Sequence, residues 1–443
     1  MGRAASTCSS PPSGCTPTSG FGAVQTAFAC ESQMDRCAAA AGLDPVEFRC
    51  RNAMSQGSPV PTGQTIDSPA PVAELLRRVQ AMPLPPQRGD GPCDLRDMPG
   101  GVCNTTRGEG VRRGAGYAAG YKNVGFSEGF DDYSTARVRL EVTDAGPLVT
   151  VHTASAEVGQ GLVTVQEQIA RTELGCEHVI IHPATTDAGS AGSSSASRQT
   201  YVTGGAGKAA CERIREHVLA LAWQRLGRTR ADLRLDGGMV VSDAGDVRVS
   251  PAAVLAGRAV EETVEWRHRP TCPVDPETGQ GFAHVQYAFA AHRAVVDVDT
   301  DLGLVKVVAL DCAQDVGTAI NPQAVEGQIH GGSAQGLGLA VMEEVQVTDG
   351  KIRNPSFTDC LIPTIGDMPP MKLDVLEYPD PHAPYGLRGV GEPPTISSTP
   401  AIVAAIRAAT GRDLPRVPVR PGDIVGLRPP AAEGLSGWAS VAE

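Results

Sequence analysis

One acidic residue near the C-terminus lies in a setting that suits catalysis. Glu392 belongs to the run PYGLRGVGEPPTI (384–396), where Gly391 precedes it and Pro393 follows it. The prolines fix the backbone and the glycines carry no side chain, so few neighbours surround the carboxylate. A carboxylate in a partly dry pocket can serve as a base near neutral pH. Taken alone, such a residue is more often an acid in a surface turn.

Three glycine-rich segments are predicted to be loops that could bind a phosphate or a polar heterocycle, and two of them carry a Gln-Gly pair. In such loops the backbone N–H groups point outward and no Cβ atom blocks a ligand. One loop of this kind is usually an ordinary entry to a helix. Because the chain has three such segments, a binding role is about as well supported as a purely structural one. The segments are 157–161, 192–199 and 331–338.

The histidines and cysteines form no recognisable metal site. His178 and His182 are the near pair, and their segment is predicted to be extended, so the two residues lie about 13 Å apart. The sequence contains no C-x-x-C, H-E-x-x-H, Walker A or G-x-S-x-G motif. We expect the 12 cysteines to be reduced thiols. A metal here would be carried by an organic ligand, and any iron–sulfur cluster by another chain.

Charge and composition exclude several classes of protein. The 443 residues carry a net charge of −12, which argues against a nucleic-acid binder or a binder of anionic membranes. No apolar run is long enough to span a membrane, and the N-terminus does not resemble a signal peptide, so we expect a cytoplasmic protein. The 51 glycines and 35 prolines predict many tight turns.

Hydrophobic periodicity predicts an α+β fold with mixed sheets and packed helices. Helices are expected over 24–42, 45–53, 72–79, 163–174, 207–226 and 401–408, the last with Pro400 at its start. Strands are expected over 135–142 and 148–154 as one hairpin, over 179–182, and over 287–299 and 304–310 as a second hairpin. The predicted divisions are an irregular segment 1–20, a helical part 21–84, a linker 85–112 and a larger unit 113–443.

Six blocks in order make this sequence resemble the molybdenum-binding subunit of the xanthine dehydrogenase and aldehyde oxidase family. It looks most like the split bacterial xanthine dehydrogenases, in which this subunit is a separate chain. The blocks include AEVGQGLVTVQEQIA and PYGLRGVGEPPTI, and they lie at 20–53, 121–130, 156–170, 195–206, 315–338 and 384–396.

The resemblance implies a molybdopterin-binding domain of the xanthine oxidase type over 113–443, preceded at 21–84 by the tail end of a first such domain. It implies a molybdenum-pyranopterin cofactor, in some bacterial members with a cytosine dinucleotide tail. The pterin dithiolene holds the metal in this family, so no protein side chain is expected as a metal ligand.

The resemblance also assigns roles to single residues. It implies that Glu392 is the catalytic base and that Phe126 lies in the substrate pocket. The residues implied to bind the cofactor are Gly159, Gln160, Gly161, Ala196, Ser197, Gln199, Gln335 and Gly336.

The implied reaction is base-assisted hydroxylation of a purine, xanthine or hypoxanthine, with water as the source of oxygen. Electrons would pass to partner chains that carry iron–sulfur clusters and FAD, and finally to NAD. The resemblance thus implies that the cofactor performs the redox chemistry, while the protein orients the cofactor and the substrate and supplies one base.

The sequence departs from the family pattern in two places. Family members are much longer, and roughly their N-terminal half has no counterpart here. The family's Arg-Gly-Phe-Gly block reads Ser19-Gly20-Phe21-Gly22. Three hypotheses therefore stay open: an enzyme completed by another chain or a longer product, a truncated inactive remnant, and a family member that acts on an aldehyde or another nitrogen heterocycle.

Overall fold

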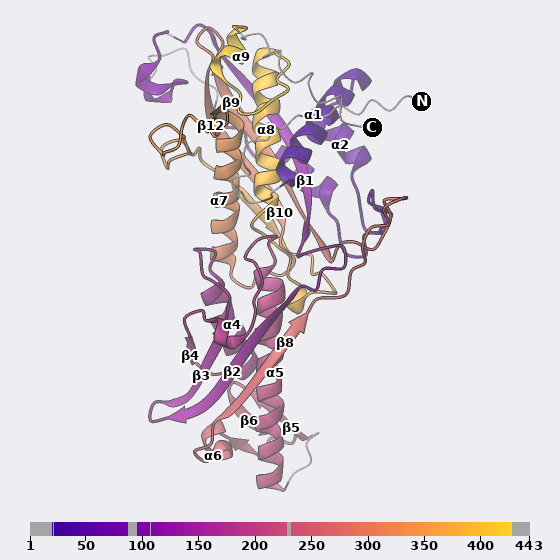
Figure 1. Ribbon diagram of the computed structural model, residues 1–443, viewed down its shortest axis with the longest axis vertical. Helices are drawn as coiled ribbons and strands as arrows, with labels where there is room; N and C mark the ends of the chain where they lie inside the picture. Colours follow the sequence, from indigo (N-terminus) through magenta and orange to yellow (C-terminus); the bar gives the residue numbers. More distant parts are fainter. Residues whose placement is uncertain (1–19, 21, 87–94, 107, 228–231, 428–443) are drawn as a thin grey trace.

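The computed structural model describes residues 20, 22–86, 95–106, 108–227 and 232–427. The predicted irregular segment, apart from Gly20, lies outside these residues. The chain forms two lobes stacked along the long axis of the molecule (Figure 1). The upper lobe contains a sheet of order β1-β9-β10-β13, and the lower lobe a sheet of order β4-β3-β2-β8. Each sheet is mixed and carries helices, which confirms the predicted α+β class.

The upper sheet has a buried central strand. Its strands are β1 (Val111–Val124), β9 (Gln286–Asp299), β10 (Leu304–Asp315) and β13 (Leu373–Leu376). Every residue of β9 is buried, because β1 and β10 flank the strand and helices cover both of its faces. Ala294, Val296 and Val298 pack in one apolar cluster with helix α8, and Phe289 and Ala291 pack in another with helix α3. The predicted hairpin of β9 and β10 is confirmed.

Helix α8 (Pro393–Thr410) lies directly on β1. The prediction that this helix begins at Pro400 is wrong, since the helix starts at Pro393 and Pro400 lies inside it. Prolines suit the first helical positions because those N–H groups have no partner within the helix. Glycines on β1 permit the close contact: a Cβ atom on Gly116 would lie 2.2 Å from the backbone nitrogen of Ala405.

Helix α7 (Pro322–Val341) packs beside α8 (Figure 1). The prediction that 331–338 forms a loop is therefore wrong. Two glycines of this segment permit close packing, since a Cβ atom on Gly336 would lie 1.8 Å from Ser398 Oγ, and one on Gly332 would lie 3.0 Å from the carbonyl oxygen of Gly391.

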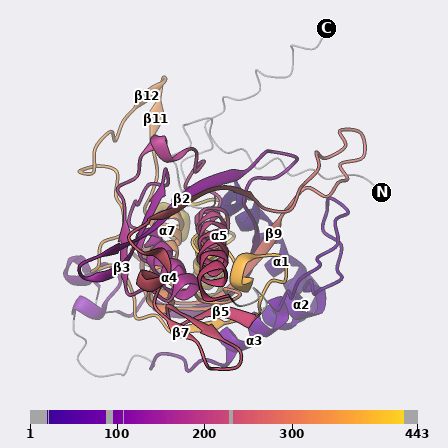
Figure 2. The ribbon, with the colours of Figure 1, turned by 90° about the horizontal axis from the view of Figure 1, so that it is seen from below.

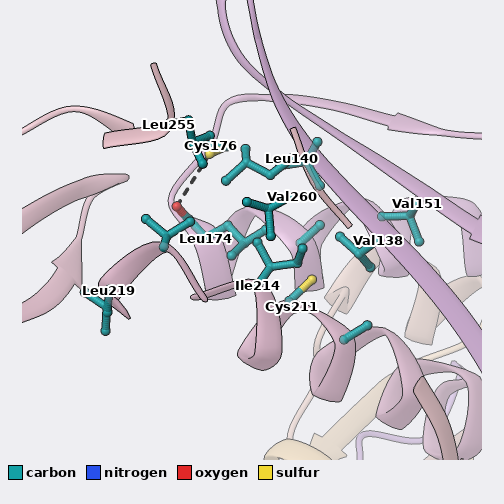
Figure 3. Packing of buried hydrophobic residues seen from close by; sticks show 14 of the residues in the cluster. Val138, Leu140, Val151, Leu174, Cys176, Cys211, Ile214, Leu219, Leu255 and Val260 are labelled. Atoms are coloured by element: carbon teal, nitrogen blue, oxygen red, sulfur yellow. Dashed lines mark hydrogen bonds between the residues drawn. The ribbon is translucent and has the colours of Figure 1, made fainter. Parts of the chain in front are cut away.

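The lower sheet carries two helices on one face. Its strands are β2 (Tyr133–Thr143), β3 (Gly146–Thr153), β4 (His178–Ile181) and β8 (Val260–Arg267), and the helices are α4 (Leu162–Leu174) and α5 (Gln199–Leu226). Figure 2 shows α5 end-on near the middle of the molecule, and Figure 3 shows part of the apolar core between the helices and the sheet. The predicted hairpin and α4 are confirmed, but α5 begins eight residues before the predicted position 207. Gly205 lies inside it because a Cβ atom there would lie 2.8 Å from the ring of Trp266.

Three N-terminal helices complete the upper lobe. They are α1 (Ala23–Ala41), α2 (Pro45–Asn52) and α3 (Val72–Ala81), close to the predicted bounds. Asp44 caps α2 as its sequence predicts, since its carboxylate accepts from the N–H groups of Val46 and Glu47. The shorter elements are η1 (Leu95–Asp97), η2 (Gly101–Cys103), η3 (Thr186–Ala188), β5 (Leu233–Asp236), β6 (Met239–Ser242), β7 (Arg248–Val249), α6 (Pro251–Leu255), β11 (Val347–Thr348), β12 (Lys351–Ile352), η5 (Pro384–Gly386) and α9 (Pro421–Val425). Among the helices in the described ranges, none combines the length and apolar character needed to cross a membrane.

One histidine ties both upper helices to the sheet. His292 on β9 is completely buried. Its Nδ1 atom lies 2.8 Å from Ser397 Oγ on α8, and its Nε2 atom lies 2.9 Å from Ser333 Oγ on α7. Burial lowers the pKa of His292 to about 3.

We expect His292 to make the fold sensitive to acid. A histidine in an unfolded chain has a pKa of about 6.5, so below that pH the unfolded state binds more protons than the folded state. The free energy of unfolding should therefore fall by about 2 kcal/mol between pH 7 and pH 5 because of this residue alone. Denaturant unfolding at both pH values should show a smaller fall for His292→Asn. His178→Asn, at an exposed position of β4, is the control, and equal falls for wild type and His292→Asn would contradict the assignment.

Candidate active site

A cavity of about 310 Å³ lies where the two lobes meet. The starts of four helices reach it. Figure 1 shows α7 and α8 extending up from this junction and α5 extending down from it. The cavity is lined by Gln160, Val165, the run 194–200, Val316, Thr318, Ile320, Asn321, Ala324, Val325, Gln328 and the run 387–392.

Glu392 is the acid of this cavity. It is the N-cap residue of α8 and is only 8% exposed. Its carboxylate accepts two hydrogen bonds, Oε1 from the backbone N–H of Gly20 at 3.0 Å and Oε2 from Ser197 Oγ at 3.0 Å. Oε2 also forms an ion pair with Lys122 Nζ at 2.8 Å. Ser197 Oγ also accepts from the backbone N–H of Glu392 at 3.2 Å. The acid is therefore held in one place by contacts from three separate parts of the chain.

The serine-rich loop before α5 reaches Glu392 through an unusual backbone. Ala196 and Ser197 both have positive φ, 63° and 51°. Residues with a Cβ rarely adopt this conformation, which is typical of functional sites where the surroundings enforce it. Arg198 anchors the loop from beneath, because its guanidinium is completely buried, pairs with Asp132 and donates to the carbonyls of Ala191 and Ser193.

The segment that leads to Glu392 is fixed by buried charges. Arg388 Nε lies 2.9 Å from Asp315 Oδ2, with both side chains fully buried. The same guanidinium donates to the carbonyls of Tyr287 and Pro69. Burial raises the pKa of Asp315, although Arg388 opposes the rise. Tyr385, which has a positive φ of 56°, donates to Glu173 on α4 and so links the segment to the lower lobe.

The Gly-Gln-Gly segment is a loop, as predicted, but its backbone N–H groups are already engaged. The carboxylate of Glu157 accepts from Gly159, Gly161 and Val163. Burial would raise the pKa of Glu157, yet these N–H groups outweigh burial and lower it. Gln160 is folded onto the same loop, where its Oε1 accepts from Val158 N–H and its Nε2 donates to the Ala156 carbonyl. One N–H of this amide has no acceptor in the described part of the chain and remains available at the cavity.

Helix α5 offers the open N-terminus at this cavity. Its N-cap residue, Arg198, makes no side-chain capping bond, whereas Glu157 occupies the start of α4 and Asn321 caps α7 through the N–H of Ala324. Helix α8 begins with two prolines, which have no N–H to donate. Among the described residues, no side chain caps the first turn of α5, where Gln199 and Thr200 lie on the cavity wall, so an anionic group would meet backbone donors and a favourable helix dipole there.

The structure separates the predicted site residues into two groups. Gln160, Ala196, Ser197, Gln199 and Glu392 line the cavity, and Gly159 and Gly161 flank Gln160. Gln335, Gly336 and Phe126 do not line it. Gly336 is a packing residue between α7 and α8, Gln335 lies about 10 Å along α7 from the cavity residue Gln328, and Phe126 packs on Phe130 and under the guanidinium of Arg198.

Two residues of the site were missed in the sequence. Gln328 lines the cavity, and its Oε1 lies close enough to Gly391 that a Cβ atom there would be 2.9 Å away. Lys122 contacts Glu392 from β1. The sequence does contain a signal for Lys122, because it falls in the inward register of an alternating strand whose other inward residues are Gly114, Gly116, Ala118, Gly120 and Val124.

The donor set fits a polar organic cofactor with phosphate. The wall presents serine hydroxyls, glutamine amides and one open helix N-terminus, and it contains the carboxylate of Glu392. Its two arginines, Arg198 and Arg388, already pair with Asp132 and Asp315. Within the described residues, no three or more His, Cys, Asp or Glu side chains gather closely enough to hold a metal ion.

Comparison with known proteins agrees with this geometry. Two models described as molybdopterin cofactor-binding domain match residues 101–369 and 5–53. The chain is 31% identical over 430 residues to a probable xanthine dehydrogenase subunit of Bacillus subtilis (strain 168), an alignment that covers 95% of this chain and 53% of the relative. It is 30% identical to an aldehyde oxidoreductase of Megalodesulfovibrio gigas, over 92% of this chain and 41% of the relative.

A solved structure of a related oxidoreductase also resembles this chain. The crystal structure of quinoline 2-oxidoreductase from Pseudomonas putida 86 superposes with a TM-score of 0.73 at 28% identity, covering 91% of this chain and 52% of that one. The chain thus spans about half the length of the relatives it matches. The matched family model covers more than half of the chain, and the chain therefore belongs to the molybdopterin cofactor-binding domain family of xanthine dehydrogenases and aldehyde oxidoreductases.

Proposed function

We propose that this chain holds a molybdenum-pyranopterin cofactor, with or without a cytosine dinucleotide tail, and supplies the base for hydroxylation of a purine such as xanthine or hypoxanthine. The observation that carries the proposal is the convergence of Glu392, Gln160 and the open N-terminus of α5 on one cavity. Such a cofactor, when bound, supplies the two-electron redox chemistry of the hydroxylation.

The residues of the chain divide the remaining tasks between them. The first turn of α5 and the serines of the run 194–197 would bind the phosphate, because backbone N–H groups and hydroxyls are good phosphate donors. The available N–H of Gln160 and the amide of Gln328 would orient polar atoms of the cofactor. Glu392 would accept a proton at its carboxylate, and its low exposure keeps bulk water away from that proton.

Partner chains are part of the proposal. The relatives include a molybdenum-binding subunit and a large chain of multi-chain enzymes, so we propose that separate chains with iron–sulfur clusters and FAD carry electrons on to NAD. We further propose 113–443 as the main cofactor-binding unit and 21–84 as the tail of a preceding one, which 85–112 connects. Cytoplasmic localisation follows from this role in purine catabolism.

The substrate class is open to a direct test. Relatives of similar identity are named for xanthine, for aldehydes and for nicotine. The chain should be purified together with the products of the genes beside its own and assayed with xanthine, hypoxanthine, an aromatic aldehyde and quinoline. NAD reduction that depends on xanthine or hypoxanthine would support the proposal. Turnover of the aldehyde or quinoline alone would reassign the substrate, and absence of molybdenum under full cofactor supply would favour an inactive remnant.

Removing the Glu392 carboxylate should abolish turnover and leave the cofactor bound. Glu392→Gln keeps the size of the side chain and removes the base, and general-base catalysis contributes roughly 100- to 10,000-fold to rate. We expect kcat to fall at least 100-fold while molybdenum content per chain stays the same. Glu177→Gln, at an exposed position, is the matched control. A variant with near-normal kcat would remove Glu392 from the mechanism.

A carboxylate placed in the first turn of α5 should compete with the anionic cofactor. Thr200 lines the cavity, and Thr200→Asp would put a negative charge where the phosphate is proposed to bind. Because acids near helix N-termini stabilise helices, Tm should stay level or rise. Molybdenum content should fall about ten-fold or more. Thr200→Asn is nearly isosteric with Asp and should retain the metal, whereas full occupancy of Thr200→Asp would place the phosphate elsewhere.

A further inference from the structure

The contacts of Glu392 assign a role to a residue outside the cavity wall. We propose that Lys122 is a positioning residue, whose buried ion pair holds the Glu392 carboxylate in place, favours its ionised form and directs the incoming proton to Oε1. The inference rests on the proposed function, in which Glu392 is the base. Lys122 does not line the cavity, and its ammonium group contacts the cavity residue Glu392. Lys122 therefore acts through Glu392.

Lys122 is a buried cation in an apolar register of β1. Inward positions of this strand alternate with outward ones, and Lys122 stands among glycine, alanine and valine at the inward positions. The side chain of Lys122 is 8% exposed and that of Glu392 is 11% exposed. A buried ammonium group needs a partner. Its partners are Glu392 Oε2 at 2.8 Å and the carbonyl oxygen of Asn123 at 2.8 Å.

The two oxygens of the Glu392 carboxylate have different surroundings. An ionised carboxylate has about four lone-pair positions, two on each oxygen. Each oxygen accepts one hydrogen bond, Oε2 from Ser197 Oγ and Oε1 from the backbone N–H of Gly20, and the Lys122 ammonium group lies 2.8 Å from Oε2. The positive charge beside Oε2 disfavours a proton there, so we expect a proton transferred to Glu392 to bind at Oε1, and the donor keeps the electron pair of the bond that breaks. No oxidation or reduction of the side chain is involved.

Other charged groups near the pair do not take over the role of Lys122. Arg198 and Arg388 are paired with Asp132 and Asp315. His284 lies within electrostatic range of Lys122, and burial lowers its pKa, with Glu128 opposing and Lys122 adding to the shift. His284 is therefore neutral at pH 7. The N-terminus of α8 adds only its dipole, since its two prolines carry no N–H.

Protonation of Glu392 would leave the Lys122 charge buried without its carboxylate partner. The pair therefore favours the ionised acid, so the base is ready before substrate binds. Replacing Lys122 by a neutral side chain should weaken the preference of Glu392 for its ionised form. The buried carboxylate then lacks a cation and takes up a proton at a higher pH.

The test follows the Glu392 carboxyl directly and needs no bound cofactor. The chain is labelled with ¹³C at the carboxyl carbon of glutamate, and its NMR spectrum is recorded from about pH 4 to pH 9. The signal that disappears in Glu392→Gln is that of Glu392. In Lys122→Met its titration midpoint should rise by about one pH unit or more, a ten-fold increase in proton affinity. Lys122→Arg should restore most of the difference, and Lys351→Met, at an exposed position of β12, should change nothing.

A midpoint in Lys122→Met within about 0.3 pH units of wild type would overturn the proposal. If Lys122→Met yields no folded chain, Lys122→Gln gives the same measurement with a smaller change in polarity. In the assembled enzyme, the acidic limb of the pH profile of kcat/KM should move up by the same amount. An inactive wild-type assembly with the expected NMR shift would refute the proposed function and leave the role of Lys122 intact.

Discussion

The reciprocal hydrogen bonds between Ser197 and Glu392 connect the two lobes at the point where chemistry is proposed. Ser197 Oγ accepts from the backbone N–H of Glu392 and donates to its carboxylate. One hydroxyl can do both only if it lies directly against the N-cap residue of α8. The left-handed backbone of Ala196 and Ser197 brings it there. Each such residue costs about 1–3 kcal/mol, and a hydrogen bond to a charged group contributes about 1.5–3 kcal/mol, so the contact with Glu392 offsets part of the strain.

A glycine before Glu392 lets the backbone pack closely enough for this contact. A Cβ atom on Gly389 would lie 2.7 Å from Val124 Cγ2 and 2.8 Å from the Cβ of Ser197. The glycine therefore lets the segment before Glu392 pass between β1 and the serine-rich loop. Arg388 next to it is held by Asp315 and by two carbonyls. The rigidity that the sequence suggests around Glu392 thus has two sources, the lack of side chains at the glycines and a buried ion pair far away in sequence.

Local patterns in the sequence predict elements well and long-range packing poorly. The helix at 45–53 could be predicted because Asp44 and Pro45 mark its start. The strands β2 and β3 could be predicted because burial of one face makes apolar and polar residues alternate along them. The segment 331–338 could not, because its glycines pack against a helix some sixty residues later, and only that contact distinguishes a packed glycine helix from a loop. Glu392, Ser197 and Gln160 could be named from motifs. Lys122 is marked in the sequence only as a charge at an inward position of β1, and its contact with Glu392 depends on long-range packing.

The cavity also keeps two negative charges apart, which a base and a phosphate in one site require. Glu157 fills the start of α4, Asn321 caps α7, and prolines replace the first N–H groups of α8. An anion entering the cavity is therefore attracted to α5, whereas Glu392 has its own cation on β1. If the phosphate instead bound at α8, it would raise the proton affinity of Glu392 and weaken the preference of that acid for its ionised form. The uneven capping of four converging helices would thus keep the proposed phosphate away from the proposed base, and this arrangement, more than any single residue, distinguishes the cavity from an ordinary junction between lobes.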